Sequence, residues 1–459
     1  MELGQLLPIW SIVPFAGMLL SIAILPLMKP EWWEKHQLRV ALAWALIFLV
    51  PFTAVFGFGE TYEQLAETVI SDYVPFMTVL LGLFVVSGGI HISGTIAGTT
   101  RNNVIMLGLG TLLASWIGTT GAAMLLIRPV LRANHWRRYK AHVVVFFIFL
   151  VANIGGCLTP LGDPPLFLGY LRGVPFFWTL QHIWPLLLVN SIFLLALFAG
   201  IDHYFYKKEG KEGAERFELE ERADDHVPIR IKGAHNILFI VMILFAVIIN
   251  GAIPQMGMFL DANGNVIGFD VSKHVHLGIN YFVQIGIILL AALLSLITTK
   301  KEIRESNDFE WGPIEEVAKL FIGIFITMIP ALALLRTYGP TLGIDTATKF
   351  FWFTGALSSV LDNSPTYVVF LTAAGSLGMG GGDAISTVVG AVPPEFLLAI
   401  SAGAVSMGAI TYIGNAPNFM VKNMAEKSGI NMPSFFGYMG WSIAILVPVF
   451  LLDTVLFFL

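Results

Sequence analysis

Thr159-Pro-Leu-Gly-Asp-Pro-Pro165 decides the fold, because its pattern returns at Thr411-Tyr-Ile-Gly-Asn-Ala-Pro417. Both copies read Thr-x-x-Gly-[Asp/Asn]-x-Pro, at a constant offset of 252 residues (159 to 411). Each follows a glycine-containing apolar stretch and precedes another apolar stretch. Gly162 and Gly414 permit unusual backbone angles, and the prolines that follow remove amide donors. We therefore expect each copy to interrupt a helix.

The sequence around both copies is apolar enough to lie in a lipid bilayer. Hydrophobic residues make up 56% of the 459 residues and charged residues only 12%, against roughly a quarter charged in soluble proteins. A run of about 20 apolar residues is long enough to cross a hydrocarbon core of about 30 Å. We predict ten crossings, at about 7–28, 38–58, 72–92, 140–171, 180–201, 235–253, 279–298, 317–337, 394–420 and 436–458.

Two further apolar stretches, about 103–131 and 347–373, are interrupted at their centres. The interruptions are Gly118-Thr-Thr-Gly121 in the first stretch and Asp362-Asn-Ser-Pro-Thr366 in the second. A straight helix centred on such residues is costly in lipid, whereas a re-entrant hairpin with its tip buried in protein satisfies the backbone. We predict a hairpin in each case; the alternative is that one of them is a full crossing.

These elements divide the chain into two similar halves. Each half holds five crossings and one hairpin, and an odd number of crossings gives the halves opposite orientations. The predicted fold class is an all-α polytopic membrane protein with two inverted repeats and discontinuous helices at mid-membrane. Repeat 1 covers 1–201, a cytoplasmic linker covers 202–234, and repeat 2 covers 235–459.

The distribution of basic residues gives the orientation. With both termini outside and both hairpins returning to their own side, 22 of the 26 Lys and Arg residues fall on the inner side. Such a bias is the one that membrane insertion favours. We predict a bacterial inner-membrane protein with both termini outside. The basic residues left outside are Arg172, Lys273, Arg336 and Lys349.

Oxygen-bearing side chains gather at the four interruptions. The residues predicted to bind an ion or a proton are Asp163, Asp362, Asn363 and Asn415, and those predicted to contact substrate are Asn153, Thr119, Thr120, Thr159, Ser364, Thr366 and Thr411. The backbone breaks are assigned to Gly162, Pro165, Gly414 and Pro417. Either aspartate could instead cap a half-helix, and both roles can coexist. Asp453, near the end of the last crossing, is expected to lie close to water.

The two carboxylates favour cation transport over the other function classes. A carboxylate that alternates between a proton and Na⁺ is a direct basis for antiport, and no Lys or Arg lies at either break. A citrate or dicarboxylate carrier is the alternative, because half-helix amides can bind an anion. A channel or an arsenite permease also fits. No Ser-His or Asp-Asp catalytic motif suggests an enzyme, and a membrane scaffold would not need buried carboxylates. The expected partners are the bilayer and a small cation, with no nucleic acid and no cofactor beyond transported Na⁺ and H⁺.

Three motifs carry a family resemblance: Leu361-Asp-Asn-Ser-Pro-Thr-Tyr367, Gly162-Asp-Pro-Pro-Leu-Phe-Leu168 and Gly414-Asn-Ala-Pro-Asn418. They resemble the ion transporter superfamily, especially NhaD-type sodium:proton antiporters and the citrate transporter-like (CitMHS-like) branch. The resemblance implies hairpins and broken helices that frame the site, a homodimer and elevator-like movement. The first hairpin tip, Gly118-Thr-Thr120, departs from the Asp-Asn or Ser-Asn-Thr tips common in the superfamily. That departure puts ion binding by the first hairpin in question.

Overall fold

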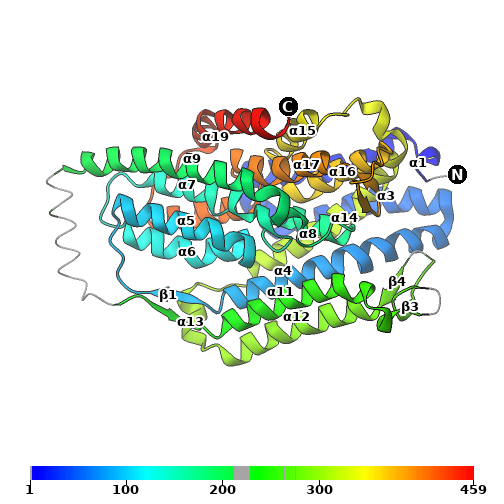
Figure 1. Ribbon diagram of the computed structural model, residues 1–459, viewed down its shortest axis with the longest axis horizontal. Coiled ribbons are helices and arrows are strands. Elements are labelled where there is room, and N and C mark those ends of the chain that lie inside the picture. Colours follow the sequence, from blue (N-terminus) through cyan, green and yellow to red (C-terminus); the bar gives the residue numbers. More distant parts are fainter. Residues whose placement is uncertain (1–2, 211–214, 216–227, 262–263, 274) are drawn as a thin grey trace.

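The computed structural model describes residues 3–210, 215, 228–261, 264–273 and 275–459, and Figure 1 shows that helices dominate it. The first half begins with a short helix, which is followed by five helical segments that form two long apolar runs, Ile9–Met28 and Pro30–Ser87. In order, its elements are α1 Leu3–Leu6, η1 Ile9–Ile12, α2 Val13–Met28, α3 Pro30–Ala66, η2 Glu67–Tyr73, α4 Val74–Ser87, β1 His91–Ser93, α5 Thr100–Ile117, α6 Thr119–Ala133, α7 Ala141–Leu150, η3 Ile154–Leu158, α8 Pro164–Leu171 and α9 Trp178–Lys208.

The second half ends with the same order of elements as the first: a helix pair, an interrupted helix and a long closing helix. Its elements are β2 Arg230–Lys232, α11 Asn236–Ala252, η4 Ile253–Gln255, η5 Gly257–Phe259, β3 Gly268–Asp270, β4 His276–Gly278, α12 Ile279–Thr298, α13 Lys301–Ser306, α14 Gly312–Tyr338, η6 Gly339–Leu342, α15 Ala347–Ser358, α16 Asn363–Ser376, β5 Ile385–Thr387, β6 Gly390–Val392, α17 Pro394–Met407, η7 Gly408–Ile410, α18 Ala416–Lys427 and α19 Phe435–Phe457.

Eight helical runs within the described residues are long and apolar enough to cross a membrane. The prediction of an all-α polytopic membrane protein is therefore confirmed. The runs are Ile9–Met28, Pro30–Ser87, Ala141–Leu158, Trp178–Lys208, Asn236–Gln255, Ile279–Thr298, Gly312–Leu342 and Phe435–Phe457.

The boundary between the second and third predicted crossings differs from the prediction. The crossings expected at 38–58 and 72–92 belong to one helical run, Pro30–Ser87. Gly57 interrupts this run with non-helical angles of φ 83° and ψ 167°, and the chain then continues as helix through the π-helical segment η2. The residues between the two crossings were expected to form a loop. Helix formation fits residues 60–67, where six of the eight residues are Glu, Gln, Leu or Ala, because all four residue types favour helix.

The interruptions predicted inside the two hairpin stretches are present. Helix α5 ends at Ile117 and α6 begins at Thr119, so the single residue Gly118 joins two helices that lie side by side (Figure 1). Gly118 has φ 80°, which a residue with a side chain rarely adopts. In the second stretch, α15 ends at Ser358 and α16 begins at Asn363.

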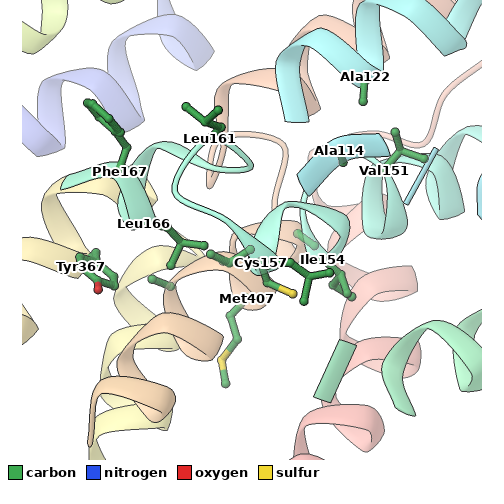
Figure 2. Packing of buried hydrophobic residues seen from close by; sticks show 14 of the residues in the cluster. Ala114, Ala122, Val151, Ile154, Cys157, Leu161, Leu166, Phe167, Tyr367 and Met407 are labelled. Atoms are coloured by element: carbon green, nitrogen blue, oxygen red, sulfur yellow. The ribbon is translucent and has the colours of Figure 1, made fainter. Parts of the chain in front are cut away.

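The interrupted helix of the first half lies at the centre of the core. Every residue of α7 from Val143 to Leu150 is at most 1% exposed, as expected of a helix that is apolar on all sides. Figure 2 shows part of this cluster, with Ile154, Cys157 and Leu161 on the segment that joins α7 to α8, and Met407 at the end of α17.

Three two-stranded antiparallel sheets join loops outside the helices. Strand β1 pairs with β2, which lies near the end of the predicted linker, and β3 pairs with β4. Strand β5 pairs with β6. Residues 211–214 and 216–227 of the linker lie outside the described residues.

Candidate functional site

Four helices begin at the interruptions, and their first residues meet around the carboxylate of Asp163. Thr119 and Asn363 are the first residues of α6 and α16. Asp163 and Asn415 are the residues just before α8 and α18. A helix N-terminus exposes unpaired N–H groups and carries a partial positive charge. The four N-termini therefore favour negative charge at this point, and Asp163 supplies one.

Asp163 is held by donors from both halves of the chain. Its Oδ1 accepts hydrogen bonds from Thr119 Oγ1 at 2.9 Å and Asn415 Nδ2 at 3.1 Å, and its Oδ2 accepts from Asn363 Nδ2 at 2.6 Å. The residue is 1% exposed. Within the described part of the chain, no Lys, Arg or His forms an ion pair with it. The carboxylate is thus buried among neutral partners.

The side chains that donate hydrogen bonds to Asp163 also carry oxygens that could bind a cation. A side-chain amide carries a carbonyl oxygen beside its NH₂ group, and a hydroxyl both donates and accepts. Rotation of Asn363 and Asn415 about their last torsion would present two oxygens to a cation beside Asp163. Carboxylate, amide and hydroxyl oxygens are the ligands that hard cations take.

The two predicted ion-binding aspartates occupy different positions. The Asp163 side chain makes no capping hydrogen bond to α8, so capping does not explain its carboxylate. Asp362 does cap its helix, because its Oδ1 accepts from the Ser364 backbone N–H at 2.9 Å. The two carboxylates still lie within electrostatic range of each other.

Each broken helix is tied to its own hairpin by the same hydrogen bond. Thr159 Oγ1 donates to the carbonyl of Ser115, and Thr411 Oγ1 donates to the carbonyl of Ser359 at 2.6 Å. These hydroxyls therefore bond the backbone and do not point at Asp163. The sequence interpretation missed the two serines. Both serines could have been found from their equivalent positions, because Ser115 lies three residues before Gly118 and Ser359 three residues before Asp362.

A comparison with protein families matches nearly the whole chain. A family described as "Putative citrate transport" matches residues 4–458. The chain belongs to this citrate transport family. The prediction of a citrate transporter-like ion transporter is thereby confirmed, and the protein is a transport protein by family. Among curated proteins, the comparison found no match.

Gly162 and Gly414 of this family member serve a different purpose from the one expected. Neither has a positive φ, so neither break uses the left-handed backbone angles that glycine readily adopts. They are needed for space: a Cβ on Gly162 would lie 2.2 Å from the Gly156 carbonyl oxygen, and one on Gly414 would lie 2.5 Å from the Gly408 carbonyl oxygen. The two glycines thus allow each break to fold back against its own helix.

An asparagine network connects the two broken helices of the transporter. Asn153 Nδ2 donates to Asn418 Oδ1 at 2.6 Å, and Asn153 Oδ1 accepts from Asn415 at 3.3 Å. Asn418 Nδ2 donates to the carbonyls of Gly408 and Thr411, each at 2.9 Å. Asn418 was quoted in the resemblance but not predicted as a site residue. The sequence feature that could have identified it is a second asparagine, directly after Pro417, in an apolar stretch.

The remaining predicted residues make no hydrogen bond to Asp163 and lie around the residues that do. Ser364 Oγ donates to Asn363 Oδ1 at 3.3 Å, and Thr366 Oγ1 donates to the Asp362 carbonyl at 2.9 Å. Thr120 is the half-buried second residue of α6. Pro165 and Pro417 are both the second residue of a restarted helix, where the missing N–H has no intrahelical partner to lose.

Proposed function

We propose that this family member is a secondary active transporter that exchanges Na⁺ for H⁺ at Asp163, with Asp362 as a second ion-binding carboxylate. The observation that supports the proposal best is a buried carboxylate with three neutral donors, two from the second half and one from the first. Such a group can bind a proton or Na⁺, but not both at once. Competition for one carboxylate couples the two flows.

The neighbours of Asp163 supply the rest of the cycle. In the empty site, Thr119, Asn363 and Asn415 point their donors at the carboxylate. When Na⁺ arrives, the two amides turn to offer oxygens. When a proton arrives, the carboxyl group becomes neutral and the ion leaves. Asp362, within electrostatic range, adds negative charge that favours a cation over an anion.

We further propose that the two halves are inverted repeats that give alternating access. The order of helix pair, broken helix and closing helix in α5–α9 returns in α15–α19, and inverted repeats with broken helices are a recurring transporter design. A division into repeats at 1–201 and 235–459 follows this order. The homodimer implied by the resemblance stays a prediction.

Contacts between loops support the predicted sides. Arg128 pairs with Asp308 at 2.7 Å, and both belong to loops predicted inside. Arg172, predicted outside, pairs at 2.8 Å with Asp72, the first residue of the crossing predicted at 72–92, which begins on the outer side. Figure 1 places β1 and α13, from inner loops, at one end of the long axis and β3 and β4, from an outer loop, at the other.

Labelling tests this topology. Single cysteines at Gly378 and His135, with Cys157 replaced, should react from opposite sides of a sealed vesicle, Gly378 from outside and His135 from inside. Labelling of both from one side would contradict the inverted repeats.

A citrate or dicarboxylate carrier is the second candidate, and two observations favour it. The family description names citrate, and four helix N-termini meet at the site, which suits an anion. In that case Asp163 would hold a co-transported Na⁺ or proton beside the substrate.

One experiment separates the two candidates. Purified protein is reconstituted into vesicles containing a pH dye, and Na⁺, Li⁺, K⁺ and citrate are added in turn, beside uptake of labelled citrate. We expect Na⁺ to move protons without citrate. Citrate uptake without Na⁺-driven proton movement would transfer the assignment to the second candidate.

A further inference from the structure

The closing helices of the two halves each hold one of the broken segments. Thr179 of α9 donates its hydroxyl to the Leu158 carbonyl at 2.8 Å, at the end of η3. Ser442 of α19 donates to the Ile410 carbonyl at 2.6 Å, at the end of η7. A change in the packing of α9 against α19 would therefore act on the backbone of both broken helices.

The two closing helices meet through a polar pair inside the membrane region. Asn190 of α9 donates its Nδ2 to Asp453 Oδ2 of α19 at 3.0 Å. Both residues are 0% exposed. The sequence interpretation placed Asp453 close to water, and this prediction is wrong: the last helix packs its carboxylate against α9.

Each residue of the pair has one oxygen left over. Among the described residues, neither Asp453 Oδ1 nor Asn190 Oδ1 has a hydrogen-bond partner. An ionised carboxylate and an amide carbonyl are both acceptors, so neither oxygen can satisfy the other. Buried polar oxygens are rarely left without a donor. The pair as it stands is short of one hydrogen.

No nearby cation compensates for a charge on Asp453. Within the described part of the chain, no Lys, Arg or His forms an ion pair with it. The Cys157 thiol on η3 lies within electrostatic range of both Asp453 and Asp163. A buried charge without a partner is strongly unfavourable, so ionisation of Asp453 would leave it unsupported.

We propose that Asp453 and Asn190 form a second proton site, separate from Asp163. One proton on Asp453 Oδ1 turns that oxygen into a donor to Asn190 Oδ1. Together with the existing bond from Asn190 Nδ2, this closes a ring of two hydrogen bonds between a carboxylic acid and an amide. The ligand is a single proton, and its loss leaves one bond and two unpaired oxygens between the closing helices. The inference concerns protonation and stands whether the transported solute is Na⁺ or citrate.

Infrared spectroscopy of the purified full-length protein tests the pair directly. A protonated carboxyl has a carbonyl stretch that an ionised one lacks, and exchange into D₂O shifts it. The wild-type protein is compared with Asp453→Asn, whose amide can pair with Asn190 and keep the packing. Asp163→Asn is the matched control, since it removes another buried carboxylate that has no ion pair among the described residues. Asn190→Leu keeps the acid but removes its partner.

We expect the acid band at neutral pH to be lost in Asp453→Asn and kept in Asp163→Asn. In Asn190→Leu the band should remain but shift to the higher frequency of a carboxyl without a hydrogen bond. If the wild type minus Asp453→Asn spectrum shows only carboxylate bands from mildly acidic to mildly alkaline pH, the proposal is overturned. Loss of the band on adding Na⁺ at constant pH would assign the pair to a cation and overturn it as well. Because Asn190→Leu gives its own readout, a folding failure of Asp453→Asn leaves the test decisive.

Discussion

The two broken helices share a frame and differ in charge. Both fold back over a glycine, both bond a hairpin carbonyl through a threonine hydroxyl, and both restart with proline as the second residue. The residue before the restart is Asp163 in the first half and Asn415 in the second. Since Asn415 holds the same position without a charge, the frame does not require a carboxylate. We therefore assign the charge of Asp163 to the proposed transport cycle.

The hairpin tips differ in the opposite sense. The first tip turns at Gly118 with a positive φ and carries no acid. The second tip places Asp362 at the start of α16, where the carboxylate caps the helix. Each half thus contributes one carboxylate, from the broken helix in the first and from the hairpin in the second.

The largest effect is expected from changes that break the shared frame. Gly162→Val and Gly414→Val each force a side chain against a backbone oxygen, at 2.2 Å and 2.5 Å from the new Cβ. We expect both to lower transport more than about a hundredfold, which corresponds to roughly 2.7 kcal/mol at the site. Membrane insertion should survive, because it depends on apolar length.

Matched controls for this pair are Gly200→Val on α9 and Gly286→Val on α12, where a new Cβ meets nothing within 4 Å. Transport should persist in both controls. Near-normal transport by either break mutant would show that the two breaks do not need the close approach seen here.

A smaller effect is expected from making the two halves alike in charge. Asn415→Asp replaces the donor that lies 3.1 Å from Asp163 Oδ1 with a second carboxylate. Two carboxylates this close cannot both ionise readily, so one keeps a proton and no longer exchanges it. We expect Na⁺-driven proton movement to fall more than about tenfold at neutral pH. Asn415→Ala removes the donor without adding charge, so Na⁺-driven proton movement should fall less in this variant. Equal losses in the two variants would mean that charge at this position is irrelevant.

The smallest effect is expected at the second hairpin tip. Asp362→Asn keeps a capping side chain, because Asn caps about as well as Asp, but removes a charge near Asp163. We expect the Na⁺ concentration for half-maximal response to rise about tenfold, or about 1.4 kcal/mol. Asp362→Ala should add a loss of stability of about 1 kcal/mol. An unchanged Na⁺ response in Asp362→Asn would leave this residue with capping alone.

The sequence predicted the membrane class and the interruptions, because apolar length and helix-breaking residues are local signals. That the interruptions frame one site was implied only by the family resemblance. The sequence did not predict that Thr159 and Thr411 bond the backbone, since hydroxyl direction depends on which carbonyl lies opposite. The role of the glycines was also misjudged, because close approach is a property of the folded pair of segments. Asp453 was misplaced for the same reason: its distance from water depends on α9, which lies far away in the sequence.

The measurement that tests the central claim most directly is the Na⁺-induced pH change in vesicles containing Asp163→Asn, beside the wild type and Asn415→Ala. Asn fits the space of Asp and can still accept hydrogen bonds, but it cannot bind and release a proton at its oxygens. The account predicts a large pH response in the wild type, a reduced one in Asn415→Ala and none in Asp163→Asn, with equal amounts of inserted protein. A wild-type response in Asp163→Asn would contradict the account and remove this carboxylate from the transport cycle.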